Sequence, residues 1–376
     1  MQPAFPLIKD LRKEWPLVIS IATTLLFLAY GETWFAGIYS ILRLSFLLLW
    51  LIVVVSISIF AVVRHADVLA AKLGEPSGTL ILTIAVTAIE SIVIISTMFA
   101  GTGNLGLARD AMLAVIMIVL NGMVGLSLLV GGLRHHEQTY NLQGANAFLA
   151  LIIPLAVLGL ILPTYMDATP GPTLSTLHAV FLIGMSLGLY AIFLAIQNFR
   201  HKHYFLSPEE RGAKEQETGG HGIASNRSTL YHAAFLIAYF LPVASLSEQL
   251  GVPIESVLHL TGAPPVLGGM LVAALVLAPE SVGAVRAALA NQLQRSVNIL
   301  LGSVLATVSL TIPFVLTASL IVGKPILLGL EIKDIIVLSL TMIMSVMTFS
   351  ASRTNVLLGA VHLLIFFAYI MIIFDR

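Results

Sequence analysis

The sequence predicts an all-α integral membrane protein with about eleven transmembrane helices. Of the 376 residues, 58% are hydrophobic and only 10% are charged, whereas an ordinary soluble domain has roughly 25% charged residues. The mean hydropathy is +0.99. A helix needs ~20 apolar residues to cross a hydrocarbon core ~30 Å thick, so the apolar residues suffice for about eleven spans. A water-soluble globular fold is therefore excluded.

The positions of the apolar runs place these helices along the chain. Residues 1–14 mix charged and apolar residues without a small-residue cleavage site, so we expect the first span to remain rather than be removed as a signal peptide. The runs are too long for outer-membrane strands and lack alternating hydrophobicity, which favours an α-helical bundle. We expect spans at about 16–35, 44–63, 77–100, 111–133, 146–163, 174–198, 230–247, 264–290, 297–322, 333–350 and 355–374.

The distribution of basic residues predicts the orientation. If the N-terminus is cytoplasmic, 14 of the 19 Lys and Arg residues fall on the inner side, as the positive-inside rule requires. The outer side then receives only five, namely Arg43, Arg109, Lys324, Lys333 and Arg376. The eleventh helix places the C-terminus outside. The expected orientation is therefore a cytoplasmic N-terminus and a C-terminus on the outer side.

One long connection divides the helices into two sets. Residues 201–229 form the expected cytoplasmic loop, which carries Glu209, Glu210, Glu215 and Glu217. Residues 1–36 contain the first helix, 37–200 contain helices 2–6 and 230–376 contain helices 7–11. Because each set has an odd number of helices, the second must insert upside down relative to the first. Two inverted five-helix repeats after one leading helix are typical of transporters.

Two acidic residues lie deep inside the predicted spans. Glu90 is in the third helix and Glu280 in the eighth, which occupy the same place in their sets of five. Each lies roughly 20 Å into its helix, near the bilayer midplane. A charged residue there costs on the order of 2.5 kcal/mol or more, so it is normally kept for a function. The alternative is a protonated glutamate that only bonds a neighbouring helix, and two such residues at matched positions argue against it.

The surroundings of both glutamates supply further oxygen atoms. Thr83, Thr87 and Glu90 follow an i, i+4, i+7 spacing, which puts two hydroxyls and the carboxylate on one helical face. Pro279 precedes Glu280 and lacks an N–H, so it frees the carbonyl oxygen of Leu275 one turn earlier. Oxygen atoms of these kinds are ligands for hard cations.

The helices that follow each glutamate are rich in small and hydroxyl residues. These residues allow close helix packing and can also coordinate a cation, and the sequence leaves both interpretations open. They are Asn121, Gly122, Gly125 and Ser127 in the fourth helix and Asn298, Gly302, Ser303, Thr307 and Ser309 in the ninth. We include the Ser303 hydroxyl among the candidate metal ligands.

Three segments resemble a known family of exchangers, and the resemblance covers essentially the whole chain. They are 74–83 (Gly-Glu-Pro-Ser-Gly-Thr-Leu-Ile-Leu-Thr) leading to Glu90, 278–280 (Ala-Pro-Glu) followed by 286–295 (Arg-Ala-Ala-Leu-Ala-Asn-Gln-Leu-Gln-Arg), and 301–307 (Leu-Gly-Ser-Val-Leu-Ala-Thr). Together they are similar to the ChaA-type calcium/proton antiporters of bacteria, a branch of the cation/proton exchangers in the calcium/cation antiporter superfamily. The resemblance implies the fold described above, a location in the inner membrane of a bacterium with a periplasmic C-terminus, and Glu90 and Glu280 as the transport carboxylates.

The sequence departs from the wider family pattern Gly-Asn-x-x-Glu at both glutamates. Val86 and Thr87 stand in place of Gly and Asn before Glu90, and Val276 and Leu277 do so before Glu280. Coordination by an asparagine amide is therefore not expected at these positions. ChaA-type members share the departure, and the resemblance implies exchange of Na⁺ and K⁺ as well as Ca²⁺ for protons.

Two buried carboxyls favour competition between a cation and protons. Two carboxylates with one Ca²⁺ are neutral and so are two carboxylic acids, whereas the empty ionised pair is costly to carry through the membrane. One Na⁺ or K⁺ with one retained proton is also neutral, so charge alone does not select the substrate. We expect an antiporter with Glu90 and Glu280 as shared cation and proton sites, working by alternating access. Its expected partners are small cations and the lipid bilayer.

Other classes of function have less support. An intramembrane enzyme that uses the two glutamates as an acid and base is the alternative from another class, but intramembrane aspartyl, zinc and serine nucleophile motifs are absent. A cation channel with one carboxylate pair in inverted repeats is unusual. No cofactor is expected. The chain has no cysteine, which excludes thiol chemistry, and the balance of 19 basic and 19 acidic residues gives no reason to expect nucleic acid.

Histidines are expected to have only a minor role. Five of them fall on the expected cytoplasmic side, where solvated interfacial side chains are the simplest interpretation and a sensing role is the alternative. They are His135, His136, His201, His203 and His221.

Overall fold

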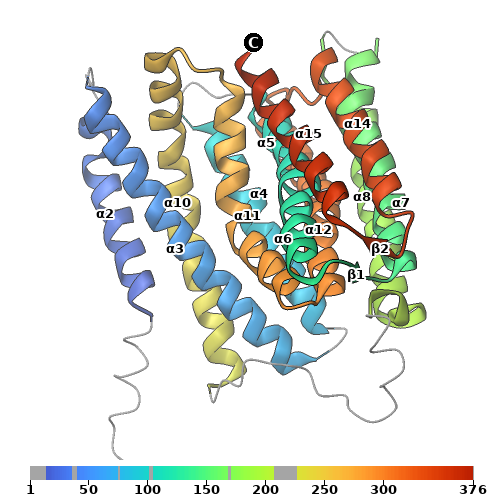
Figure 1. The fold of residues 1–376 in the computed structure, drawn as a ribbon. Helices are drawn as coiled ribbons and strands as arrows, with labels where there is room; N and C mark the ends of the chain where they lie inside the picture. The colour runs from blue at the N-terminus through green and yellow to red at the C-terminus, as the bar shows by residue number, and fades with distance from the viewer. Residues whose placement is uncertain are drawn as a thin grey trace, which may run out of the picture. The chain divides into compact units, whose positions relative to one another are not determined.

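A computed structural model describes residues 14–35, 40–74, 77–100, 105–167, 171–206 and 227–375 of the chain. Eleven successive helical spans occur within these residues, as predicted. Ten are long and apolar enough to cross a membrane. The remaining one, α14 (Ile332–Thr348), has 17 residues, at the short end of what a span needs. The chain forms two compact units, both drawn in Figure 1.

Unit 1 comprises Met1–Asn104 and His221–Pro265. Two of its helices have 33 residues each, which at 1.5 Å per residue is about 50 Å and exceeds the ~30 Å of the hydrocarbon core. These two long helices pack along each other, and α4 packs against both. The helices of unit 1 are α2 (Trp15–Phe35), α3 (Ile41–Leu73), α4 (Ser77–Phe99) and α10 (Thr229–Thr261).

The two long helices of unit 1 extend beyond their predicted ends. The sequence predicts spans at 44–63 and 230–247, whereas α3 continues to Leu73 and α10 to Thr261. On α3, buried positions continue past the apolar run at helical spacing, through Val62, His65 and Leu69. The helix therefore continues because one face remains packed, although its other face has become polar.

Close contacts hold the helices of unit 1 together. The hydroxyls of Ser20 on α2 and Ser58 on α3 lie 2.6 Å apart and share a hydrogen bond. On α4, the Thr97 hydroxyl donates to the carbonyl oxygen of Ser247 on α10 at 3.0 Å. One turn further along α10, Gly251 lies so near Ala100 that a Cβ atom there would overlap the alanine methyl group. Glycine thus sets the distance between α4 and α10.

Unit 2 comprises Leu105–Gly220 and Val266–Arg376. Its spans are helical throughout, and several change from α to π geometry partway. In chain order the elements are α5 (Leu107–Ile116), π-helix η2 (Met117–Met123), α6 (Val124–His135), strand β1 (Gln138–Thr139), α7 (Leu142–Ala156), π-helix η3 (Val157–Ile161), 3₁₀ helix η4 (Leu162–Tyr165), α8 (Thr176–Ala195), π-helix η5 (Ile196–Arg200), 3₁₀ helix η6 (Lys202–Phe205), α11 (Val266–Leu289), α12 (Leu293–Ala306), π-helix η7 (Thr307–Thr311), α13 (Ile312–Val322), α14, strand β2 (Arg353–Thr354) and α15 (Val356–Phe374).

The loops of unit 2 meet in two groups, one at each end of the helices. At one end, Leu327 N donates to Leu105 O at 3.1 Å, and Gly329 N donates to Pro172 O at 3.2 Å. These bonds join the connections after the third, fifth and ninth spans. All three connections must therefore lie on the same side of a membrane. This agrees with eleven successive crossings, in which the connections after odd-numbered spans share one side.

The opposite end of unit 2 joins the remaining loops. Strands β1 and β2 pair antiparallel, with Gln138 opposite Thr354. The Gln138 amide also donates to Asn291 Oδ1 at 3.0 Å, in the turn between α11 and α12. Thus the loops after the fourth, eighth and tenth spans share the other side. The sequence does not predict this two-residue strand pair, since its segments are too short to show any periodicity.

Equivalent helices of the two five-helix sets run in opposite directions. In unit 1, the Lys72 ammonium near the end of α3 donates to the carbonyl oxygen of Arg227, just before α10 begins. In unit 2, Gln138 follows the fourth span and bonds Asn291, which precedes the ninth. The second and seventh spans are thus antiparallel, as are the fourth and ninth. The fourth and ninth spans also share a central π-helical segment, η2 or η7. The inverted repeat is confirmed.

The predicted domains are consecutive segments of the chain, whereas each compact unit combines helices from both repeats. Unit 1 takes the leading helix together with α3, α4 and α10. The expected cytoplasmic loop 201–229 begins with η6 and ends just before α10. Its four glutamates lie outside the described residues.

Replacing Gly251 by alanine is expected to destabilise the protein. The added methyl group overlaps Ala100 and lies 3.1 Å from the Thr97 carbonyl oxygen, and such overpacking costs about 1–3 kcal/mol. Gly188→Ala on α8 is the matched control, because an added Cβ atom there meets nothing within 4 Å and alanine favours a helix. Thermal unfolding in detergent measures both. Equal melting temperatures for the two variants would contradict the close contact.

Candidate functional site

Glu90 lies buried in α4, nine residues before the end of the helix at Phe99. Its side chain is 5% exposed. The helix that carries it packs against both α3 and α10. A buried carboxyl on a membrane span needs a proton, a cation or hydrogen-bond donors.

The two threonines predicted to accompany Glu90 lie on the same helix. Thr87 is buried and Thr83 is half-buried, and the helical geometry of α4 places both on the face of Glu90. Ser91, the next residue along the helix, is also buried, but adjacent residues of a helix do not share a face. Unit 1 thus contributes one carboxylate and several hydroxyl oxygens.

Glu280 occupies the equivalent position in unit 2. It is half-buried in α11, and it also lies nine residues before the end of its helix, at Leu289. The helix continues without a break through Pro279, so the carbonyl oxygen of Leu275 loses the hydrogen bond that an N–H at position 279 would donate. Leu275 itself is buried. The carboxylate and a freed backbone oxygen therefore lie within about one turn.

Ser303 lies on α12, which packs against the helix of Glu280. The serine is half-buried. Further along the same span, Ser309 is fully buried in η7, and its hydroxyl has no hydrogen-bond partner among the described residues. Asn298 has a different role, since its amide donates to Phe205 O at 2.7 Å and accepts from Gln294 at 2.8 Å. The packing interpretation therefore applies to Asn298.

The predicted site residues divide between the two units. Unit 1 brings Thr83, Thr87 and Glu90 together on one face of α4. Unit 2 holds Glu280 on α11 and Ser303 on the adjacent α12. Each unit thus supplies one glutamate with hydroxyl residues close by in sequence or on a neighbouring helix.

The segment that carried part of the resemblance, 286–295, shapes the turn between α11 and α12. Asn291 has a positive φ of 59°, a conformation that asparagine tolerates better than most residues. Gln138 caps the turn by donating to Ala288 O at 2.9 Å. On the α12 side, Gln294 Oε1 accepts a hydrogen bond from the backbone N–H of Asn141. These residues position the helix of Glu280, and none of them lies deep in a span.

A buried polar network in unit 2 was missed by the sequence analysis. Asn121 in η2 donates to Thr341 Oγ1 at 2.8 Å, and its Oδ1 lies 3.1 Å from His362 Nδ1. The other ring nitrogen of His362 lies 2.9 Å from Thr348 Oγ1. All four side chains are fully buried. Because an amide oxygen only accepts, Nδ1 of His362 carries a proton and Nε2 accepts from Thr348.

This network joins three spans through η2. Its members lie on the fourth, tenth and eleventh spans, and η2 also packs against α11, the helix of Glu280. A π-helical segment is rare and occurs mostly at functional sites. The sequence signal for the network is the histidine itself, since an ionisable residue in the middle of a span is seldom incidental.

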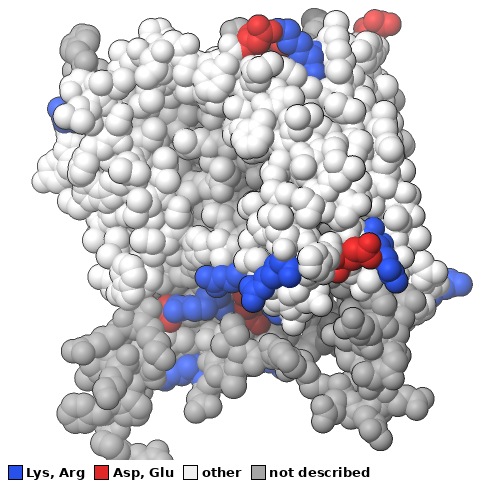
Figure 2. All heavy atoms as spheres, viewed as in Figure 1, with Lys and Arg blue, Asp and Glu red and all other residues white. Residues whose placement is uncertain are grey.

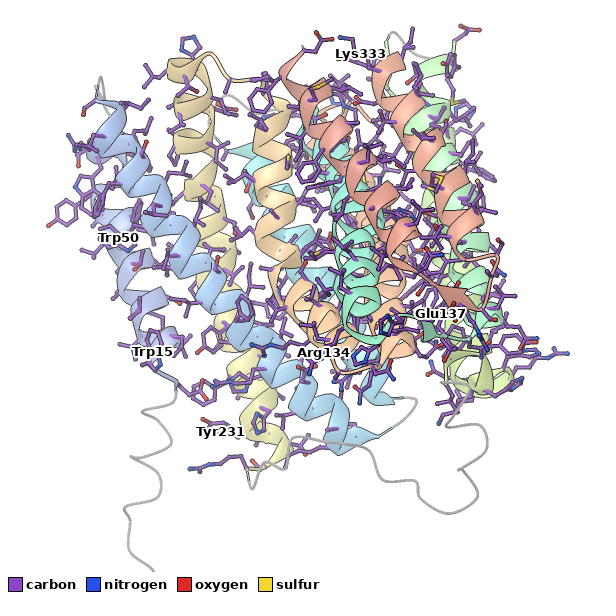
Figure 3. The ribbon with its side chains drawn as sticks, in the orientation of Figure 1. Trp15, Trp50, Arg134, Glu137, Tyr231 and Lys333 are labelled. Atoms are coloured by element: carbon purple, nitrogen blue, oxygen red, sulfur yellow. The ribbon has the colours of Figure 1, made fainter. Side chains whose placement is uncertain are left out.

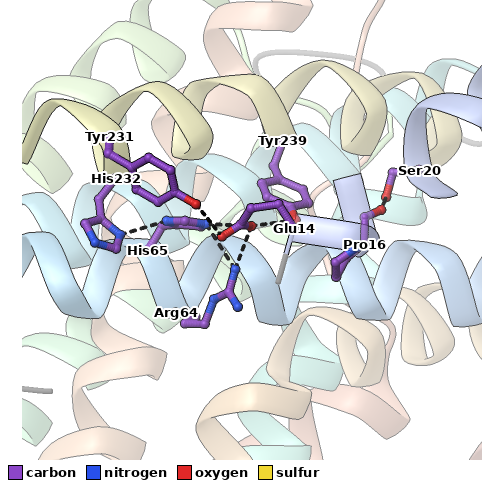
Figure 4. Close-up of polar contacts among 8 residues, drawn as sticks. All are labelled: Glu14, Pro16, Ser20, Arg64, His65, Tyr231, His232 and Tyr239. Atoms are coloured by element: carbon purple, nitrogen blue, oxygen red, sulfur yellow. Dashed lines mark hydrogen bonds and ion pairs between the residues drawn. The ribbon is translucent and has the colours of Figure 1, made fainter. Parts of the chain in front are cut away.

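A second missed cluster surrounds Glu14, immediately before α2 (Figure 4). Its carboxylate is 5% exposed and accepts four hydrogen bonds. From α3, Arg64 Nη2 donates to Oε2 at 2.7 Å, and His65 Nε2 donates to the same oxygen at 3.2 Å. From α10, the hydroxyl of Tyr231 donates to Oε1 at 3.0 Å and that of Tyr239 to Oε2 at 3.2 Å. Glu14 thus links the leading helix to one helix of each repeat.

Donors around Glu14 determine its ionisation. Burial alone would raise the pKa of this carboxyl group, but the hydrogen bond from His65 and the charge of Arg64 outweigh burial and lower the pKa to about 2. Glu14 is therefore ionised at every physiological pH. No sequence signal marks it, because its partners are distant along the chain.

Charged side chains of unit 2 gather at the ends of its helices. Figure 3 labels Lys333 at one end and Arg134 and Glu137 at the other. Lys333 pairs with Asp375 at 2.6 Å, and Arg353 pairs with Glu137 at 3.2 Å. Between these ends, the face visible in Figure 2 is almost free of charged atoms. This pattern is typical of helices that cross a bilayer.

Spans arranged in inverted repeats, with one glutamate at the same place in each, define an integral-membrane ion exchanger. The sequence pattern of the sodium/calcium exchanger protein family matches residues 44–199 and 231–374. The chain belongs to this family, and the family predicted from the three resembling segments is confirmed.

Two relatives cover most of the chain. The putative ionic transporter y4hA of Sinorhizobium fredii (strain NBRC 101917 / NGR234) is 39% identical over 316 residues, which are 84% of this chain and 85% of the relative. The sodium-potassium/proton antiporter ChaA of Escherichia coli (strain K12) is 37% identical over 374 residues, which span both chains completely. Both are transporters, in agreement with a transport function.

A solved structure shares the fold. The structure of native YfkE has a TM-score of 0.71 and covers 96% of this chain and 100% of its own, at 18% sequence identity. At this identity the similarity establishes the arrangement of helices alone. The predicted fold class, one leading helix and two inverted sets of five, is confirmed.

Replacing Glu14 by glutamine is expected to destabilise the protein most near neutral pH. A folded pKa of about 2 against an ordinary value of 4.5 means that the ionised carboxylate stabilises the fold fully above pH 4.5, and that this stabilisation is lost as the pH falls toward 2. The expected loss at pH 7 is about 3 kcal/mol.

Thermal unfolding in detergent between pH 7 and pH 3 tests this expectation. Glu32→Gln serves as the control, because Glu32 is an exposed glutamate on α2, the helix that Glu14 immediately precedes. The difference between wild type and Glu14→Gln should narrow below pH 4.5. A constant difference over the whole range would show that the charge of Glu14 does not matter.

Replacing His362 by leucine is expected to lower the free energy of unfolding by about 1–3 kcal/mol, because Asn121 Oδ1 and Thr348 Oγ1 each lose a buried partner. His259→Leu is the control at an exposed histidine in the last turn of α10. Melting temperatures in one detergent compare the two variants. Unchanged stability of His362→Leu would mean that the network contributes nothing to the fold.

Proposed function

We propose that this protein is a secondary antiporter that exports cytoplasmic Ca²⁺, together with Na⁺ and K⁺, in exchange for protons. Glu90 and Glu280 are the shared cation and proton sites in this proposal. The observation that supports this proposal is that the two glutamates occupy equivalent positions in the repeats. Each glutamate lies nine residues before the end of the same helix in one of two inverted repeats, in a chain of the sodium/calcium exchanger family.

Electrostatics explains why transport through these sites is an exchange. An ionised carboxylate in a low-dielectric interior is costly, so each glutamate crosses the membrane neutralised. Ca²⁺ neutralises both carboxylates, and two protons do the same. Na⁺ or K⁺ neutralises one and leaves a proton on the other. The unloaded protein with both carboxylates ionised is the state with the highest energy. It therefore does not change between the two access states without a bound cation or protons, which prevents transport in one direction without exchange.

The proposed cation ligands are the two carboxylates and nearby oxygen atoms. Thr83 and Thr87 supply hydroxyls on the Glu90 side, and Ser303 supplies one on the Glu280 side. The carbonyl oxygen freed by Pro279 adds a backbone ligand. Oxygen ligands of these kinds are those that Ca²⁺ takes, 6–8 in number, and a monovalent cation needs fewer.

Alternating access is proposed to involve the antiparallel pair α3 and α10. These two helices are equivalent members of the inverted repeats and pack along each other within unit 1. A pair related in this way can slide between two mirrored positions that differ little in energy, because each helix takes over the contacts of the other. Sliding opens the site to one side of the membrane at a time.

The relatives bear on the choice of cation. The full-length relative ChaA is named a sodium-potassium/proton antiporter, and a Ca²⁺/H⁺ antiporter of Aphanothece halophytica is 23% identical over 68% of this chain. The loss of both asparagines from the family pattern removes two neutral ligands, which weakens selectivity for Ca²⁺ over monovalent ions. These observations support a mixed cation range.

The proposed orientation places the N-terminus in the cytoplasm of a bacterium and the C-terminus in the periplasm. Lys333 and Arg134 lie at opposite ends of unit 2 (Figure 3), as the positive-inside assignment of these two residues requires. The intramembrane enzyme considered from the sequence has no support from the matched proteins, which are transporters by name. No resident cofactor is part of the proposal.

Exchange in everted membrane vesicles or proteoliposomes tests this proposal. Ca²⁺, Na⁺ and K⁺ are added separately while a fluorescent dye reports luminal pH. Each cation that is a substrate should release protons from the lumen of wild-type vesicles. Glu90→Gln and Glu280→Gln should each abolish the release, because an amide neither binds a proton nor neutralises a cation.

Glu137→Gln is the control, since Glu137 is an exposed residue outside the spans. A uniport or channel predicts a different result, in which cation flux continues in a glutamine variant without proton movement. Proton release that persists in both glutamine variants, with correctly inserted protein, would show that these residues are not the coupling sites.

A further inference from the structure

Two buried histidines of unit 1 lie in direct contact beside Glu14 (Figure 4). His65 on α3 and His232 on α10 face each other with their Nδ1 atoms 2.9 Å apart. His65 is 1% exposed and His232 is 6% exposed. The contact joins the C-terminal part of one long helix to the first turn of the other. Neither residue is used by the exchange mechanism proposed above.

The geometry fixes how many protons this pair holds. Two ring nitrogens at 2.9 Å form a hydrogen bond only if one carries a proton and the other offers a lone pair. The outer nitrogen of His65, Nε2, lies 3.2 Å from the ionised Glu14, to which a proton on this nitrogen is donated, and also 3.2 Å from the Arg64 guanidinium. The contact therefore holds one proton between the two Nδ1 atoms. A second proton would place two N–H groups against each other.

The surroundings of the pair combine one anion with several cations. The titratable and charged groups around it are Glu14 before α2, Arg64 and Lys72 on α3, Arg227 before α10, and Tyr231 and Tyr239 on α10. Glu14 favours a positive charge on His65. Arg64 and Lys72 oppose a second positive charge on His232. The local charge balance thus accommodates one protonated imidazole and resists two.

We propose that His65 and His232 form a proton-binding site separate from Glu90 and Glu280, and that protonation of both rings breaks the contact between α3 and α10. The site takes protons from the water at that end of unit 1, which the Arg64 side chain reaches with 42% of its surface exposed. The contact is intact while at most one of the two rings is charged. When acid charges both rings, each Nδ1 carries a proton, and repulsion between the two imidazolium rings separates the helix ends.

The consequence for transport rests on the proposed function. In that proposal α3 and α10 slide as a pair between the two access states. Loss of the histidine contact at one end loosens the packing of the two helices and so hinders this sliding. In the proposed orientation this end faces the cytoplasm. Acidification of the cytoplasm would then slow the import of further protons, and an alkaline cytoplasm would permit it. The two glutamates would supply the coupling and the histidine pair the response to pH.

Distance measurement between spin labels tests the site without any transport. The chain has no cysteine, so a double variant Leu73→Cys with Leu230→Cys takes labels only at these positions. Both residues are exposed, one at the end of α3 and the other at the start of α10. In full-length protein the distance distribution should shift to longer values between pH 8 and pH 5.5.

Adding His232→Gln to this labelled protein should remove the shift. A glutamine amide can donate to or accept from His65 at any pH without a charge, so the contact survives acidification. His259→Gln, at an exposed histidine of the same helix, is the control and should keep the shift. No change in the protein with native histidines, or the same shift in His232→Gln, would overturn the proposal.

Proton flux separates this proposal from the proposed function. In vesicles, the fall in exchange rate from pH 8 to pH 6 should be at least about threefold larger with native histidines than in His232→Gln, in which only the competition at the two glutamates remains. If neither the protein with native histidines nor His232→Gln exchanges cations, the proposed function is wrong. The distances between the spin labels still test the histidine site in that case. A pH profile in His232→Gln that matches the native one, with exchange intact, would contradict control by this pair.

Discussion

The energetic cost of an ionised carboxylate in an apolar environment is the constraint on which the rest of this structure depends. The protein satisfies it in two different ways. Glu14 is neutralised permanently, by Arg64 and by hydroxyl and imidazole donors from two helices. Glu90 lies in a span with hydroxyl residues around it and no basic residue in its own helix. A carboxylate with permanent partners, such as Glu14, is structural. In the proposed function, a carboxylate whose partner can exchange, such as Glu90, is a transport site.

Inversion of the repeats explains several features together. The second and seventh spans are antiparallel, the fourth and ninth are too, and both of the latter contain a π-helical segment at their centre. Loops of unit 2 accordingly gather in two groups by backbone hydrogen bonds. Two inverted repeats present equivalent elements to both sides of a membrane, so the same fold can form one conformation open to the cytoplasmic side and an equivalent one open to the other side. The leading helix α2 has no counterpart in this symmetry.

Composition and apolar runs are sufficient to predict eleven spans, the inverted repeat and the depth of Glu90 and Glu280, because the bilayer imposes one length and one polarity on every helix. The full lengths of α3 and α10 are not predictable in this way, since beyond the bilayer only one face of each helix remains apolar. Contacts of Glu14 with His65 and Tyr231 join residues far apart in the sequence, and no local pattern marks them. The π-helical segments leave no periodicity of their own within a uniformly apolar span.

The contacts of Glu14 have a consequence for how far this fold can be simplified. Symmetry alone suggests that the two five-helix repeats form the minimal transporter and that the leading helix is dispensable. The carboxylate at the start of that helix, however, is the common acceptor for Arg64 and His65 from one repeat and Tyr231 and Tyr239 from the other. A ten-helix version would leave a guanidinium and an imidazole without their anion at the junction of the repeats. Removing an element that lies outside the symmetry would thus disturb both symmetric halves.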